Sequence, residues 1–241
     1  MMATLKMFNS YNQEVDLLEK HVRDLFDGTS ELEILEAGCG RSWPLNLNGI
    51  KYKITGVDID QRALESRVND ARDLDEAILA DLRYLDLGSR RFDVIYNSFV
   101  LEHVENARLV LENLHYWLKP GGLLILKVPD LNTVFGFVTR MTPFWFHVAY
   151  YKYILGRKNA GKPGFGPYPT HYDQIVSRDG IREFCKSHHL EVKEEYGLCT
   201  YQVEKGIRTQ LVRIVAISVS VISLGRLPWK HNNLTYVLKK I

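Results

Sequence analysis

Cysteine, long apolar runs and an excess of either charge are scarce in this chain of 241 residues. Its three cysteines, Cys39, Cys185 and Cys199, form neither a CxxC pair nor a zinc-ligand spacing, which argues against a disulfide framework or a zinc cluster and indicates reduced, cytosolic-type thiols. No apolar run reaches the roughly 20 residues of a membrane span, and residues 1–10 do not resemble a secretory signal. We therefore expect a cytoplasmic protein.

The charges nearly cancel. Lys and Arg total 31 against 29 Asp and Glu, so the formal net charge is only +2, too small for the electrostatic field of a dedicated nucleic-acid binder. With 46% hydrophobic and 25% charged residues and no internal repeats, the composition is that of a globular protein, and we predict one domain over residues 1–241.

Short β-prone runs alternate with stretches of helical periodicity. Amphipathic helices are predicted over 15–26, 104–118 and 177–188. The predicted strands cover 32–35, 52–57, 77–80, 92–96, 123–128, 190–196 and 234–239. This order predicts an α/β fold with a doubly wound, Rossmann-like sheet of seven strands, mostly parallel, with an antiparallel terminal pair.

An aromatic stretch interrupts this alternation. Residues 135–153 hold eight of the 27 aromatic residues of the chain, and the segment 156–169 that follows carries four glycines and three prolines. We interpret 133–170 as an insert made of an aromatic helix and a loop. The helix either packs on the core or closes as a lid over an apolar ligand.

A second insert is predicted over 203–231, between the last two strands. It contains the apolar run 211–224, for which a buried helix is expected. The alternative is shallow contact with a membrane surface, because Arg226 and Lys230 follow the run.

The turn after the first predicted strand carries Gly38 and Gly40, which let a ligand approach the backbone at the carboxyl edge of the sheet. Asp58 ends the next strand, 20 residues after Gly38, where a carboxylate can accept the hydroxyl protons of a ribose. A helix cap is the alternative role for Asp58, although Asp60 fits that role better. A dinucleotide site would need a third glycine, but position 43 is Trp, so a nicotinamide oxidoreductase is disfavoured.

Five segments within residues 33–128 resemble, in order, the motifs of class I S-adenosylmethionine-dependent methyltransferases. The first is Glu-Ala-Gly-Cys-Gly at 36–40 and the second is Gly-Val-Asp-Ile at 56–59. The others are Phe-Asp-Val-Ile at 92–95, Leu-Glu-His-Val at 101–104 and Leu-Lys-Pro-Gly-Gly at 118–122. Ser42 in place of the usual glycine and the short segment 44–48 in place of a longer helix depart from the family pattern.

The resemblance implies S-adenosyl-L-methionine as the cofactor and assigns a site to it. Glu36 and the backbone of Gly38, Cys39 and Gly40 would lie near the methionine part, and Asp58 on the ribose. The remaining implied residues are Ile59, Asp81 and Leu82 around the adenine, with the backbone of Asn97 at the methionine amino group. Asp81 has a solvated loop carboxylate as its alternative role.

A general base is needed only when the methyl acceptor is a hydroxyl, and His103 and His171 are the candidates. The segment around His103 also resembles the ubiquinone-pathway O-methyltransferases, some of which bind a metal through an acidic residue three positions before the Glu. Here that position is Phe99, so no metal is predicted.

We therefore expect a methyltransferase acting on a small or amphipathic molecule, preferably on oxygen. The resemblance favours a lid role for the aromatic insert. We expect the protein to bind a small-molecule or lipid-like acceptor and to contact a membrane peripherally. We do not expect it to bind nucleic acid. The alternatives are a C- or N-methyltransferase of a lipid or sugar-lipid, and a binding module without catalysis.

Overall fold

One mixed sheet organises the chain, which we describe from a computed structural model over residues 5–162, 165–171, 173–200 and 206–241. The strand order is β1-β7-β8-β6-β5-β2-β3-β4, and β8 alone runs antiparallel to its neighbours β6 and β7. The doubly wound sheet and its antiparallel terminal pair were therefore predicted correctly. The strands are β1 (Lys6–Met7), β2 (Leu32–Ala37), β3 (Tyr52–Asp58), β4 (Glu76–Leu79), β5 (Phe92–Ser98), β6 (Leu118–Pro129), β7 (Leu190–Leu198) and β8 (Asn233–Lys240).

The sheet has eight strands rather than the seven that the sequence predicts. The additional strand, β1, pairs in parallel with β7 through Lys6 and Met7. Two residues are too few to show the alternation by which a strand is recognised. β1 exists because the outer edge of β7 offers unpaired backbone groups to the N-terminal segment.

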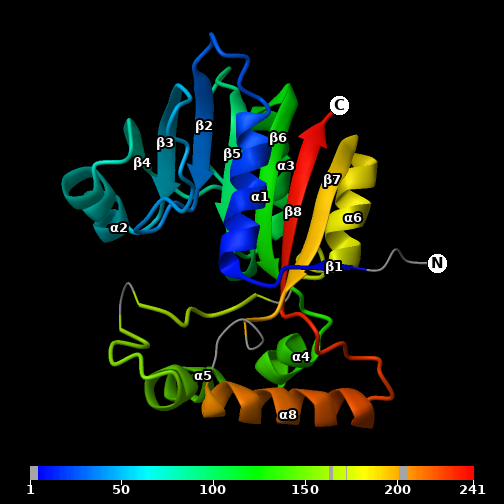
Figure 1. Cartoon of the computed structure of the whole chain (residues 1–241). Helices are drawn as coiled ribbons and strands as arrows, with labels where there is room; N and C mark the ends of the chain where they lie inside the picture. The colour runs from blue at the N-terminus through cyan, green and yellow to red at the C-terminus, as the bar shows by residue number, and fades with distance from the viewer. Residues whose placement is uncertain (1–4, 163–164, 172, 201–205) are drawn as a thin grey trace.

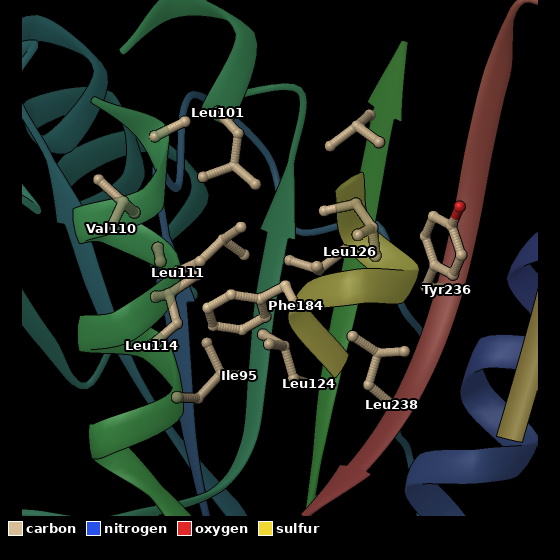
Figure 2. Packing of buried hydrophobic residues seen from close by; sticks show 14 of the residues in the cluster. Ile95, Leu101, Val110, Leu111, Leu114, Leu124, Leu126, Phe184, Tyr236 and Leu238 are labelled. Atoms are coloured by element: carbon tan, nitrogen blue, oxygen red, sulfur yellow. The ribbon is translucent and has the colours of Figure 1, made fainter. Parts of the chain in front are cut away.

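Helices cover both faces of the sheet, and the side chains of β6 show why both faces are apolar. Leu124, Leu126 and Val128 belong to one buried cluster, while Leu123 and Ile125 belong to another. Successive side chains of a strand point to opposite faces, so a strand buried on both sides reads as a continuous apolar run. Figure 2 shows the first cluster, where α3 and α6 pack against the sheet. Helix α1 packs on the other face.

Side-chain caps fix the starts of four helices. Ser10, Asp60, Thr133 and Ser177 each accept a backbone N–H from the first turn of the helix that follows. Such a cap stabilises a helix by about 1 kcal/mol. The helices are α1 (Tyr11–Arg23), α2 (Gln61–Ser66), α3 (Ala107–Trp117), α4 (Val134–Met141), α5 (Phe144–Ala149), α6 (Arg178–Ser187) and α8 (Ile207–Ile222), with a 3-10 turn at Leu101–His103 and π-helical turns at Arg67–Ala71 and Tyr150–Ile154.

The aromatic stretch does not form the single helix that its composition predicts. It divides into α4 and α5, because Pro143 lacks the N–H that a continuous helix would need and disfavours helical backbone at Thr142.

The expectation of a buried helix over 211–224 is also wrong. Helix α8 forms there, but within it only Ala216 and Ser220 are buried among the described side chains, whereas Ile222 is 81% exposed. No described segment covers its outer face.

Helices α4, α5 and α8 lie together beyond the carboxyl ends of the parallel strands, at the bottom of Figure 1. We call residues 131–162, 165–171 and 206–231 the cap. Among the described residues no helix is both long enough and apolar enough to cross a bilayer.

Candidate active site at the carboxyl edge of the sheet

The glycine loop, residues 38–42, is held down by the end of β3. The amides of Gly38 and Cys39 both donate to the carbonyl oxygen of Val57, at 2.8 and 3.0 Å. Gly38 has φ +77°, a conformation that side chains with a Cβ rarely adopt, and a Cβ at this position would overlap the side chain of Val100. The loop therefore needs glycine at position 38 for two independent reasons.

Asp58 organises the same loop from the end of β3. One carboxylate oxygen accepts the N–H of Gly40 at 2.8 Å, and the other accepts the N–H of Asp60 at 2.8 Å. A carboxylate has about four acceptor positions, so Asp58, which is half-buried, retains acceptors for further hydroxyl donors. Ile59 beside it is 75% exposed and offers an apolar surface at this edge. The predicted cap role belongs to Asp60, which accepts the N–H of Arg62.

A buried guanidinium, which sequence reasoning missed, supports the loop. Arg67 is fully buried and lies 2.8 Å from the Glu36 carboxylate and 2.6 Å from that of Asp73. It also donates to the carbonyl oxygen of Cys39 at 2.7 Å. Burial raises the pKa of Glu36 to about 7, and Arg67 opposes that rise. Glu36, predicted near the methionine part, is thus tied to the support of the loop.

Cys39 is buried, and burial raises the pKa of its thiol to about 12, so it stays a neutral thiol. Its backbone N–H and carbonyl oxygen are both engaged within the loop support, by Val57 and by Arg67.

The structure places the two predicted adenine residues after β4 differently. Asp81 is held by the Arg83 guanidinium, whose Nη2 lies 2.6 Å from Oδ2, and this hydrogen bond lowers the pKa of the carboxyl. Leu82 is only 5% exposed and belongs to the apolar core. The exposed side of the Asp81 carboxylate can therefore still contact a ligand, whereas Leu82 packs in the core beneath the loop that follows β4.

Asn97, at the end of β5, is fully buried beside the glycine loop. Its side-chain amide donates to the carbonyl oxygen of Ala37 at 2.8 Å, while its Oδ1 has no hydrogen-bond partner among the described residues. A buried oxygen without a partner is costly, unless a ligand donates to it.

The two predicted histidines come together after β5. Nδ1 of His103 lies 2.8 Å from the carbonyl oxygen of Pro169, and the backbone N–H of His171 donates to the carbonyl oxygen of Glu102 at 2.7 Å. A carbonyl only accepts, so Nδ1 of His103 carries the proton and Nε2 holds a free lone pair. Burial lowers the pKa of His103, which keeps the ring neutral near pH 7. The ring of His171 is exposed.

Glu102 is a second residue that the sequence did not single out. Burial raises its pKa to about 8, and its Oε2 has no partner among the described residues. It is therefore protonated at neutral pH and adds no negative charge beside His103, whose Nε2 lies 3.8 Å from Oε1.

Residues 165–171, which we call the strap, connect the histidines with the cofactor edge. The Arg41 guanidinium lies 5.9 Å from the ring centre of Phe165 and 3.7 Å from the Asp60 carboxylate. Tyr168 packs edge-on against His103 with ring centres 5.6 Å apart. Burial raises the pKa of Tyr168, and the negative charges of Asp60 and Asp58 raise it further.

The profile of the family described as "Methyltransferase domain" matches residues 8–195. The chain belongs to this methyltransferase family. Among curated relatives, the ubiquinone biosynthesis O-methyltransferase of Rickettsia prowazekii is 26% identical over 194 residues, which is 76% of this chain and 68% of the relative. That of Rickettsia canadensis is 28% identical over 195 residues, with 76% and 71% covered.

Two solved structures share the fold of this methyltransferase. The magnesium protoporphyrin IX methyltransferase of Synechocystis PCC 6803 with bound SAH gives a TM-score of 0.55 at 15% identity and covers 95% of this chain and 83% of its own. The cyclopropane synthase MmaA2 of Mycobacterium tuberculosis gives 0.56 at 16% identity, with 99% and 90% covered. The family agrees with the predicted cofactor, S-adenosyl-L-methionine.

The described residues contain no group of three His, Cys, Asp or Glu side chains that could hold a metal ion.

We predict that Asp58→Ala weakens S-adenosylmethionine binding by about 1.5–3 kcal/mol, the cost of losing charge-assisted hydrogen bonds. Isothermal titration calorimetry with a protein of native circular dichroism measures the loss. Asp86→Ala is the matched control, because Asp86 is an exposed carboxylate in the loop between β4 and β5 and is not one of the site residues. Wild-type affinity in a folded Asp58→Ala protein would remove Asp58 from the site.

Proposed function

We propose that this protein transfers the methyl group of S-adenosylmethionine to a hydroxyl group of a small apolar or amphipathic molecule. The observation that carries the proposal is the strap. Its Pro169 carbonyl oxygen and Tyr168 ring hold His103, and its Phe165 lies against Arg41, which pairs with Asp60 next to Asp58. The names of the curated relatives support oxygen as the acceptor atom. A lipid-like acceptor belongs to the same proposal.

The residues at the edge fit the cofactor. Gly38 and Gly40 are partly exposed in the loop, and Asp58 keeps free acceptor positions for the two ribose hydroxyls. Oδ1 of Asn97 is a buried acceptor that has no donor among the described residues. The bound cofactor supplies a methyl group already activated on a sulfonium. Catalysis by this chain is then mainly alignment and exclusion of water.

His103 is the base in this proposal. The carbonyl oxygen of Pro169 fixes the tautomer and the orientation of the ring, so Nε2 can take the hydroxyl proton of the acceptor. Because Glu102 is neutral, it does not favour protonation of the His103 ring. His171, whose ring is exposed, holds the backbone of Glu102 in place.

The aromatic insert acts as the lid in this proposal. Its loop already reaches the cofactor edge through Phe165 and Tyr168, and the exposed side chains of α5, such as Trp145, supply the apolar surface for an acceptor. Aromatic side chains around a sulfonium also stabilise its positive charge.

We predict that His103→Ala lowers turnover by about 10²–10⁴-fold, the usual contribution of a general base, with little change in cofactor affinity. Incorporation of label from methyl-labelled S-adenosylmethionine into phenols with apolar tails, or into fractionated cell extract, measures turnover. The pKa of His103 is lowered, so the wild-type rate should stay level down to a pH below 6.5 and fall as Nε2 becomes protonated.

His171→Ala is the matched control and should retain most of the activity. Equal turnover in wild type and His103→Ala would mean that alignment alone drives the reaction or that another group is the base. Titration with S-adenosylmethionine, S-adenosylhomocysteine and a nicotinamide dinucleotide tests the class: tight binding of the dinucleotide would favour an oxidoreductase, and binding of S-adenosylmethionine without turnover would favour a binding module.

A further inference from the structure

The charges of this protein are divided between the cap and the sheet. Sequence positions 131–171 and 206–231 contain nine Lys and Arg and no Asp or Glu, whereas the other positions hold 22 Lys and Arg against all 29 Asp and Glu. The near-neutral chain is thus a cationic cap on an anionic sheet domain. The cations are Arg140, Lys152, Arg157, Lys158, Lys162, Arg208, Arg213, Arg226 and Lys230.

The same cap exposes large apolar side chains. Along α8 the exposed apolar residues follow helical spacing and form one stripe, made of Ile207, Leu211, Ile214, Val215, Val221 and Ile222. Leu224 follows at 86% exposed, and Met141 and Trp145 in the aromatic insert are each 69% exposed. A patch of this kind on a folded protein marks an interaction surface.

A groove lies beside the stripe, where α4 contacts α8. It has a volume of about 490 Å³ and is lined by Phe137, Val219, Ile222, Leu224, Leu227 and the charged Arg226, with Ser223. An apolar groove with a guanidinium among its lining residues suits a molecule that has an apolar chain and an anionic head.

We propose that the cap docks on the surface of a bilayer rich in anionic lipids, with α8 lying in the interface. Its apolar stripe would enter the boundary between headgroups and acyl chains, and the surrounding cations would contact the anionic headgroups. With 16 residues, α8 is about 24 Å long and falls short of a span. A second copy of the chain is a poor occupant, because two cationic faces would repel each other.

The role of this docking in the reaction rests on the proposed function. The cap lies at the carboxyl edge of the sheet, so docking turns the candidate active site toward the bilayer (Figure 1). An amphipathic acceptor dissolved in the membrane would then reach the strap without crossing water.

Flotation of the full chain with lipid vesicles tests the proposal. We expect binding to vesicles of phosphatidylcholine with 30% phosphatidylglycerol, at least tenfold weaker binding to phosphatidylcholine alone, and loss of binding at high salt. Trp145 should show a blue-shifted emission that brominated lipids quench, and Trp145→Phe should remove this signal.

Two sets of variants localise the surface. Ile214→Glu with Ile222→Glu should lower vesicle binding at least tenfold, whereas Leu79→Glu with Tyr116→Glu, which alters exposed apolar residues outside the cap, should not. Lys152→Gln with Lys158→Gln should weaken binding by about fivefold per charge, and Lys20→Gln with Lys51→Gln is its control.

Failure of the wild type to bind anionic vesicles, or equal binding by the cap variants, would overturn the proposal. So would concentration-dependent dimerisation that Ile214→Glu with Ile222→Glu abolishes, because the stripe would then be a contact between copies. Cofactor titration on the same variants keeps the two proposals apart. A protein that binds vesicles but transfers no methyl group keeps the docking surface and loses the proposed function.

Discussion

Gly38→Val is expected to lower the affinity for S-adenosylmethionine at least a hundredfold, or about 3 kcal/mol. Position 38 has φ +77°, and a Cβ there would overlap Val100. The valine must therefore shift either the loop or the start of the segment after β5, which carries His103 and follows Asn97. Calorimetry on protein with native circular dichroism measures the loss.

Gly28→Val is the matched control for the backbone. Its φ is +89° and a Cβ there would meet nothing within 4 Å, so it shares the conformational strain without the collision or the site. We expect a modest loss of stability and unchanged cofactor binding. Retained affinity in folded Gly38→Val protein would show that the glycine loop does not hold the cofactor.

Arg67→Met is expected to destabilise the fold by about 3–5 kcal/mol, the usual cost of removing one partner from a buried charged cluster. Glu36 is 3% exposed, and without Arg67 its carboxylate would lose its cation while the carbonyl oxygen of Cys39 would lose its donor. The free energy of unfolding in urea gives the magnitude.

The loss in Arg67→Met should depend on pH with a definite sign. The pKa of Glu36 is raised in the folded state, to about 7 even with Arg67 present, and removal of the guanidinium raises it further. Below that pH the carboxyl is protonated and needs no cation, so the deficit should shrink as the pH falls from 8 toward 5.

Two further variants isolate this cluster. Arg62→Met changes an exposed arginine of α2 and should alter stability by no more than about 0.5 kcal/mol. Adding Glu36→Gln to Arg67→Met should recover part of the loss, because the uncompensated charge is gone. A loss that is independent of pH and is not recovered would mean that Arg67 acts through packing alone.

The positions of Gly38 and Asp58 could be predicted because both lie at the carboxyl ends of strands. The apolar runs that end at these residues fix where the strands stop, and parallel strands bring their carboxyl ends to one edge. The family resemblance, rather than this argument, pointed to Asn97. The sequence could not distinguish Arg67 from Arg62 or Arg72, because the three arginines lie in one polar stretch with similar neighbours.

The sequence by itself determined the alternation of strands and helices, the antiparallel terminal pair and the residues at the strand ends, because periodicity and turn residues act over a few neighbours. Tertiary structure decided the rest. His103 and His171 are equivalent as sequence, but only the chain path brings the carbonyl of Pro169, 66 residues away, onto one ring. The apolar run of α8 is compatible with a core or a surface, and its exposure depends on whether another segment covers it, which no local pattern records.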